Sequence, residues 1–81
     1  MKKQELIKLI KQQLIEIIPE LEGESLGINT PLIDFGANSI DRSELIMLCL
    51  ESLDLEVPRV KFVGADTIEA LANLLHQFSK T

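Results

Sequence analysis

Few residues of this chain have side chains that could do covalent chemistry. Ser39 stands in the stretch "FGANSIDRSE" (residues 35–44), and the sequence has one cysteine, Cys49, and one histidine, His76. A serine, a histidine and an aspartate form the triad of many hydrolases. His76 is predicted near the end of the last helix, and so small a chain leaves no walled substrate site. Cys49 falls among apolar helix residues and is predicted to be a small core residue. We therefore expect no enzyme.

Ser39 instead lies where a helix is predicted to begin. Asn38 or Ser39 suits the capping position, and a cap is one sufficient explanation for the serine. A helix N-terminus also presents free N–H groups and a positive dipole end, which favour a phosphate ester on that hydroxyl. Gly36 and Ala37 before it would leave the approach uncrowded. Both interpretations, a cap and a modified serine, remain open on this local pattern.

The charge of the chain is concentrated in its middle. Residues 1–18 carry a net charge of +2, residues 19–56 a net of −8 and residues 57–81 a net of +1. Phosphate backbones bind Lys and Arg, so this balance argues against nucleic acid and favours basic protein partners. No apolar run is long enough to span a membrane. The single cysteine allows no intrachain disulfide, and we expect a cytoplasmic protein.

Apolar spacings predict an all-α fold. Spacings of three and four predict a helix over about residues 3–18, ended by Pro19. A second helix is predicted over residues 39–53, and a short helical turn is predicted after Pro58. A last helix is predicted from about residue 66, with Asp66 as its cap and Glu69 in a capping box. The long connection 19–38 should pack across the core, pinned by Leu26, Ile28, Leu32, Ile33 and Phe35. We predict one domain, residues 1–81, with three main helices, one short helix and a long first loop.

The helix over 39–53 is predicted to have an inner and an outer face. Leu45, Leu48, Cys49 and Ser52 form the predicted inner stripe. Ile40, Met47 and Leu50 are predicted to point partly outward, flanked by acids. An exposed apolar strip ringed by acid is typical of a helix to which other proteins dock. The predicted partner-binding residues are Ile40, Asp41, Arg42, Glu44, Met47, Leu50 and Glu51.

With its acidic charge, helical layout and "DFGANSIDRSEL", the chain resembles an acyl carrier protein over its whole length. The matching residues are Gly36, Ser39, Ile40 in place of the usual Leu, and Glu44. The resemblance implies a four-helix bundle of acyl carrier type. It also implies that 4′-phosphopantetheine is joined to Ser39 through a phosphodiester. The terminal thiol of that arm would carry an acyl group as a thioester, and the protein itself would catalyse nothing.

Asn38 stands where most such proteins have Asp. The string "GANSIDR" is similar to that of free-standing donor carriers in polyketide β-branching cassettes, and the lack of Trp favours the donor over the acceptor type. The resemblance implies a malonyl, then acetyl, cargo and a monomer. Implied partners are a phosphopantetheinyl transferase, an acyltransferase, a ketosynthase-like decarboxylase and an enzyme resembling hydroxymethylglutaryl-CoA synthase. Arg42 interrupts the acidity beside Ser39 and is expected to select against partners of other carriers.

Three other functions stay open at this point. The chain could be a general fatty-acid or polyketide carrier, a peptidyl or D-alanyl carrier, or a helical interaction domain without a prosthetic group. In the last case Ser39 would be only a cap. For a short cargo in so small a bundle, we expect the acyl group to stay in solvent.

Overall fold

The apolar spacing of the N-terminal segment produces α1, Lys3–Ile17. Leu6, Ile10 and Leu14 recur every four residues and are fully buried along one side of it. The computed structural model describes residues 2–79. Its further elements are the 3-10 turns η1 (Pro19–Leu21), η2 (Leu32–Phe35) and η3 (Arg59–Phe62), and the helices α2 (Ser39–Leu53) and α3 (Ile68–Phe78).

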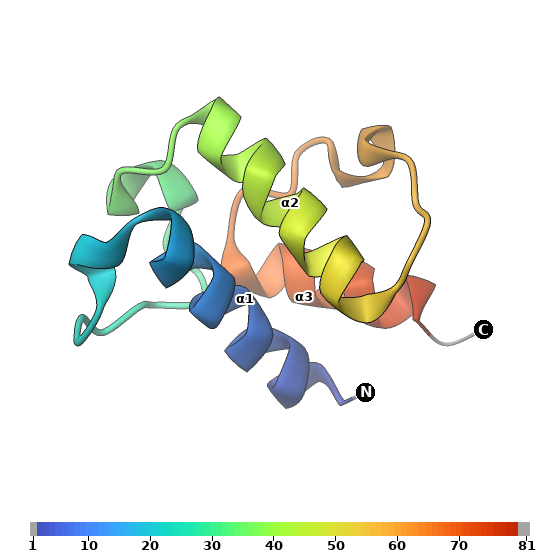
Figure 1. Ribbon diagram of the computed structural model, residues 1–81, viewed down its shortest axis with the longest axis horizontal. Helices are drawn as coiled ribbons and strands as arrows, with labels where there is room; N and C mark the ends of the chain where they lie inside the picture. Colours follow the sequence, from blue (N-terminus) through green and yellow to red (C-terminus); the bar gives the residue numbers. More distant parts are fainter. Residues whose placement is uncertain (1, 80–81) are drawn as a thin grey trace.

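The helices form a small bundle of 34 × 23 × 20 Å. In Figure 1, α1 lies against α2 and α3, and both contacts are extensive. The predicted fold of three main helices and one short helix is confirmed, with η3 as the short element. Within residues 2–79 no strand forms, and an isolated antiparallel bridge joins Pro31 to Thr67.

The first loop is pinned to the bundle by side chains and by its backbone. Leu26 and Leu32 are buried as predicted, but Ile33 is 64% exposed, so its predicted role as a pin is wrong. In a 3-10 turn residues three apart share a face, so Leu32 and Phe35 turn inward and Ile33 turns outward. The Leu32 amide donates to the Asp66 carbonyl at 2.8 Å, and the Glu69 amide donates to the Ile28 carbonyl at 2.9 Å. The loop is therefore held by the start of α3.

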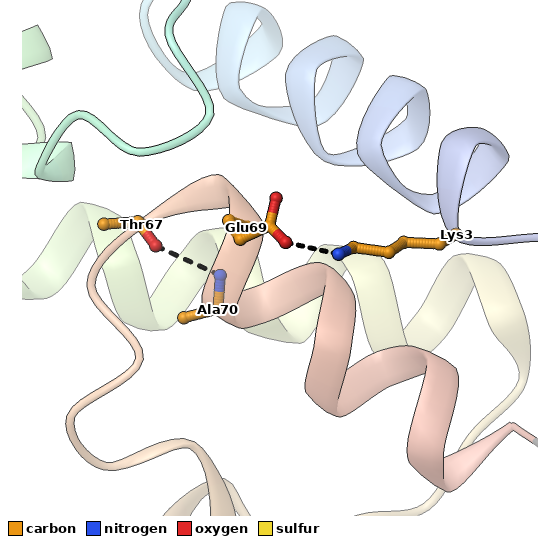
Figure 2. Close-up of polar contacts among 4 residues, drawn as sticks. All are labelled: Lys3, Thr67, Glu69 and Ala70. Atoms are coloured by element: carbon orange, nitrogen blue, oxygen red, sulfur yellow. Dashed lines mark hydrogen bonds and ion pairs between the residues drawn. The ribbon is translucent and has the colours of Figure 1, made fainter.

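The start of α3 differs from the prediction by one residue. Thr67 is the N-cap, and its hydroxyl accepts a hydrogen bond of 3.0 Å from the Ala70 amide (Figure 2). Thr67 is extended because the bridge to Pro31 holds it there, so Asp66 cannot be the cap. The Glu69 carboxylate does not close a capping box. It pairs with the Lys3 ammonium and so ties the start of α1 to the start of α3.

Candidate functional site

α2 begins at Ser39 behind a reciprocal capping box. The Asn38 side-chain oxygen accepts from the Asp41 amide at 2.8 Å, and the Asp41 carboxylate accepts from the Asn38 amide at 3.2 Å. Asn38, rather than Ser39, is therefore the cap, and the Ser39 hydroxyl is not used to start the helix. Ser39 is exposed and sits in the first turn, where backbone N–H groups have no intrahelical acceptor.

The residues before Ser39 keep its surroundings open. Gly36 ends η2 with a left-handed φ of 90°, a conformation that glycine adopts without strain. A Cβ placed on Gly36 would meet nothing within 4 Å, so this glycine serves the turn and not a close contact. Buried Ala37 then anchors the chain to the core. Ser39 lies on the wall of a shallow pocket of about 170 Å³, which Ile33, Asn38 and Asp66 also line.

The other two residues that could serve as a base or a nucleophile are His76, which lies far from Ser39, and Cys49, which lies inside the core. α2 has 15 residues and is about 22 Å long. Asp54 and Leu55 at its far end share a pocket with Gln77 and Phe78, so His76, in the last turn of α3, lies at the opposite end of the helix from Ser39. Cys49 is buried, and desolvation raises the pKa of its thiol to about 12. These positions exclude a Ser39–His76 triad and an activated Cys49 thiolate.

The outer side of α2 carries the predicted mixture of acids and apolar residues. Glu44 and Glu51 are exposed, while Asp41 is half-buried and partly occupied by the capping box. Ile40 is 76% exposed and Met47 is 46% exposed, so the predicted outward positions of these two residues are confirmed. Ile40, Glu44, Met47 and Glu51 form an exposed strip that starts next to Ser39 and runs along α2.

Two positions of α2 are corrected by the structure. Leu50, predicted to be partly outward, is buried, and Ser52, predicted to be inward, is exposed. The buried stripe consists of Leu45, Ile46, Cys49 and Leu50. α2 packs against α1 and also against η3, whose residues lie beside Ile46. Leu50 is therefore removed from the docking strip.

Arg42 lines the shallow pocket beside Ser39, and its guanidinium is hydrogen-bonded to the segment after η3 begins. It is half-buried, and its Nη1 donates to the carbonyl oxygens of Phe62, at 3.4 Å, and of Ala65, at 3.2 Å. The guanidinium therefore holds the η3–α3 connection against the first turns of α2. Its remaining N–H groups are the part that a partner could reach.

Sequence reasoning missed the exposed residues of η3. Val60 is 70% exposed and Val63 is 76% exposed, and Arg59 and Lys61 alternate with them and are exposed too. The Arg59 Nη1 lies 3.9 Å from the Met47 sulfur, so η3 and the strip on α2 adjoin. The available signal is the pair of valines next to Arg59 and Lys61, although Val63 is the C-cap and lies just past the end of η3.

The chain is similar in sequence to proteins of known family. A model of the family described as "Phosphopantetheine attachment site" matches residues 8–75. The polyketide biosynthesis acyl-carrier-protein AcpK of Bacillus subtilis (strain 168) is 36% identical over 76 residues, which are 94% of this chain and 93% of that protein. An acyl carrier protein of Cyanidioschyzon merolae (strain NIES-3377 / 10D) is 28% identical over 81 residues, with 90% of this chain and 89% of that protein covered.

The chain is also similar to a solved structure. It matches a chain in the crystal structure of the curacin biosynthetic pathway HMG synthase in complex with acetyl donor-ACP, with a TM-score of 0.87 and 40% sequence identity. The match covers 93% of this chain and 96% of that chain.

Within residues 2–79, no helix is both long and apolar enough to cross a bilayer.

Proposed function

The chain belongs to the acyl carrier proteins, the family with the phosphopantetheine attachment site, and from that premise we propose that it donates acetyl groups in polyketide β-branching. The observation that carries the proposal is the match, at 40% identity and a TM-score of 0.87, to a chain solved with an HMG synthase and an acetyl donor-ACP. The accepting enzyme would resemble hydroxymethylglutaryl-CoA synthase. The malonyl precursor implies an acyltransferase and a ketosynthase-like decarboxylase as earlier partners, in the cytoplasm.

Ser39 is the proposed attachment site of 4′-phosphopantetheine. Its hydroxyl is exposed at the start of α2, is not the helix cap and has a shallow pocket beside it. Backbone N–H groups of the first turn of α2 and the positive end of the helix dipole favour the phosphodiester. When bound, the group supplies a flexible arm whose thiol holds the acyl group as a thioester. The chain contributes presentation and partner recognition, and no catalytic group of its own.

The attachment is tested by intact-mass spectrometry. The purified chain is incubated with coenzyme A and a broad-specificity phosphopantetheinyl transferase, and we expect one phosphopantetheine per chain. Ser39→Ala should abolish the mass gain, whereas Ser43→Ala, one helical turn later, should leave it unchanged. A gain that persists in Ser39→Ala would refute the assignment. Ser39→Asn, which can still form a cap, should also stay unmodified.

The donor role is tested by turnover with a synthase of the β-branching type. The acetyl-loaded chain should support condensation on an acceptor carrier far better than an acetyl-loaded carrier of general fatty-acid synthesis. Equal turnover by the two carriers would refute the donor assignment while leaving the carrier chemistry intact. Loading by an amino acid, seen by mass spectrometry after reaction with a candidate ligase, would instead favour a peptidyl or D-alanyl carrier.

The strip of Ile40, Met47, Glu44 and Glu51, with the accessible parts of Asp41 and Arg42, is the proposed partner-binding face. Glu44→Lys or Glu51→Lys should slow association with a basic partner, most strongly at low salt where charges are least screened. Glu16→Lys, an exposed acid on α1, is the matched control and should change association little. A rate that does not depend on salt in any of the three variants would contradict the proposed face.

A further inference from the structure

Arg42 stands between two hollows of the surface. It lines the shallow pocket of about 170 Å³ to which Ser39 belongs, and also a second hollow of about 410 Å³ between α2 and η3. Among the described residues that line the pocket at Ser39, Arg42 is the one base and Asp66 is the one acid. A negatively charged group on the Ser39 hydroxyl therefore has Arg42 as its basic neighbour in this pocket.

The spacing of Ser39 and Arg42 places their side chains next to each other. The two residues are three apart in the first turns of α2. Residues at this spacing are neighbours on the surface of a helix, with Cβ atoms about 5–6 Å apart. Both also lie on the wall of the same pocket. The long arginine side chain can therefore bring its guanidinium to a group that is attached to the serine.

The fold uses one nitrogen of the Arg42 guanidinium. Nη1 donates to the Phe62 carbonyl at 3.4 Å and to the Ala65 carbonyl at 3.2 Å. Both distances exceed the usual N–H···O separation of about 2.9–3.0 Å, and both acceptors are neutral. A guanidinium has five N–H donors in a rigid fork, so the two bonds leave the donors on Nη2 and Nε for another acceptor.

A phosphodiester on Ser39 would lie in mostly acidic surroundings. It carries one negative charge, and the first turns of α2 also contain Asp41 and Glu44, in a chain whose net charge is −5. The positive end of the α2 dipole offsets part of this repulsion. An arginine offsets more, because a hydrogen bond between two charged groups is roughly twice as strong as a neutral one. The residues of the pocket thus fit the phosphate end of 4′-phosphopantetheine.

We propose that Arg42 binds the phosphodiester on Ser39 within the same chain, while its Nη1 keeps the carbonyls of Phe62 and Ala65. The proposal rests on the proposed function, since it requires the prosthetic group on Ser39. Arg42 then joins the base of the arm to the connection between η3 and α3. Attachment of the group is thereby transmitted to a segment that is distant in sequence from the serine.

This contact gives the modified chain a structural difference besides the arm itself. In the unmodified chain, the guanidinium of Arg42 is held from one side, by two long bonds to neutral acceptors. In the modified chain it is held from both sides, so the connection between η3 and α3 is fixed more firmly to α2. The first atoms of the arm are held as well. Arg42 is therefore a positioning residue that determines where the arm leaves the surface.

Thermal unfolding of the apo- and holo-proteins provides the first test. Arg42→Gln removes the charge and the fork. Arg59→Gln makes the same change at an exposed residue that lines only the second hollow, and is the control. The change in Tm on modification should be more positive by at least about 4 °C in the wild type and in Arg59→Gln than in Arg42→Gln, a difference that shrinks with salt. A purely structural Arg42 would lower the Tm of both forms equally, and that result would overturn the proposal.

Nuclear magnetic resonance locates the contact without an activity assay. In the wild type, modification should move the Nε–H resonance of Arg42 and the amide resonance of Val63, which follows the bonded Phe62 carbonyl. The phosphorus resonance of the holo-protein should change in Arg42→Gln and stay the same in Arg59→Gln. The wild-type resonances need no substitution, so they decide the question even if Arg42→Gln folds poorly. Unmoved Arg42 and Val63 resonances would overturn the contact, whereas a wild-type chain that is not modified at Ser39 would refute the proposed function itself.

Discussion

Replacement of the cap Asn38 tests how the serine is held at the helix start. Asn38→Ala removes the acceptor of the 2.8 Å hydrogen bond from the Asp41 amide and leaves that amide without an intrahelical partner. Loss of such a cap costs about 1 kcal/mol, within a range of about 0.5 to 2 kcal/mol. In a domain of this size, about 1 kcal/mol lowers Tm by roughly 4–8 °C. Asn38→Asp and Asn38→Ser keep an acceptor and should differ from the wild type by a few tenths of a kcal/mol.

Thermal unfolding followed by far-UV circular dichroism measures this difference. Asn73→Ala, an exposed amide within α3, controls for the loss of a surface asparagine. The rate of phosphopantetheine transfer to Ser39 is recorded on the same variants, and it should fall in Asn38→Ala because the first turn of α2 frays. A wild-type Tm in Asn38→Ala, or an equal loss in Asn38→Asp and Asn38→Ala, would refute the account of the capping box.

The remaining predictions concern the core, the cysteine and the ion pair. Leu50→Ala should cost about 2–5 kcal/mol in denaturant unfolding and Met47→Ala under about 1 kcal/mol; equal losses would contradict the corrected face of α2. With its pKa raised to about 12, Cys49 is thiolate in roughly one molecule in 10⁴ at pH 8, so iodoacetamide should spare it in the folded apo-protein and label it after unfolding. A double-mutant cycle of Lys3→Ala and Glu69→Ala should give a coupling below about 1 kcal/mol that falls with salt; a coupling that survives high salt would contradict a screened pair.

The parts of the fold that depend on local signals could be predicted from the sequence. Leu6, Ile10 and Leu14 have a spacing that identifies the buried side of α1 without knowledge of the rest. The start of α2 is equally local, because the cap Asn38 and the glycine before it lie within a few residues of Ser39. The candidate serine could therefore be identified from the sequence alone.

The parts that failed depend on distant segments. α2 has apolar residues around most of its circumference, so its periodicity does not select one face. Its orientation depends on the elements that pack against it, α1 and η3, and both are distant in sequence. The carbonyl partners of Arg42, at residues 62 and 65, are also distant in sequence, and no local pattern indicates them. The cap of α3 is Thr67 and not the predicted Asp66, because Thr67 forms a bridge with Pro31, which is distant in sequence.

The attachment of the first loop to α3 affects when the serine can be recognised during synthesis. The loop that leads to Ser39 is bonded to Asp66 and Glu69, which the ribosome adds long after the serine. A nascent chain that ends before these residues contains the whole "DFGANSIDRSEL" stretch but lacks the hydrogen bonds that place it. As the proposed attachment site, Ser39 should therefore become a good substrate for modification only after residues 66–69 have been synthesised and hold the loop in place.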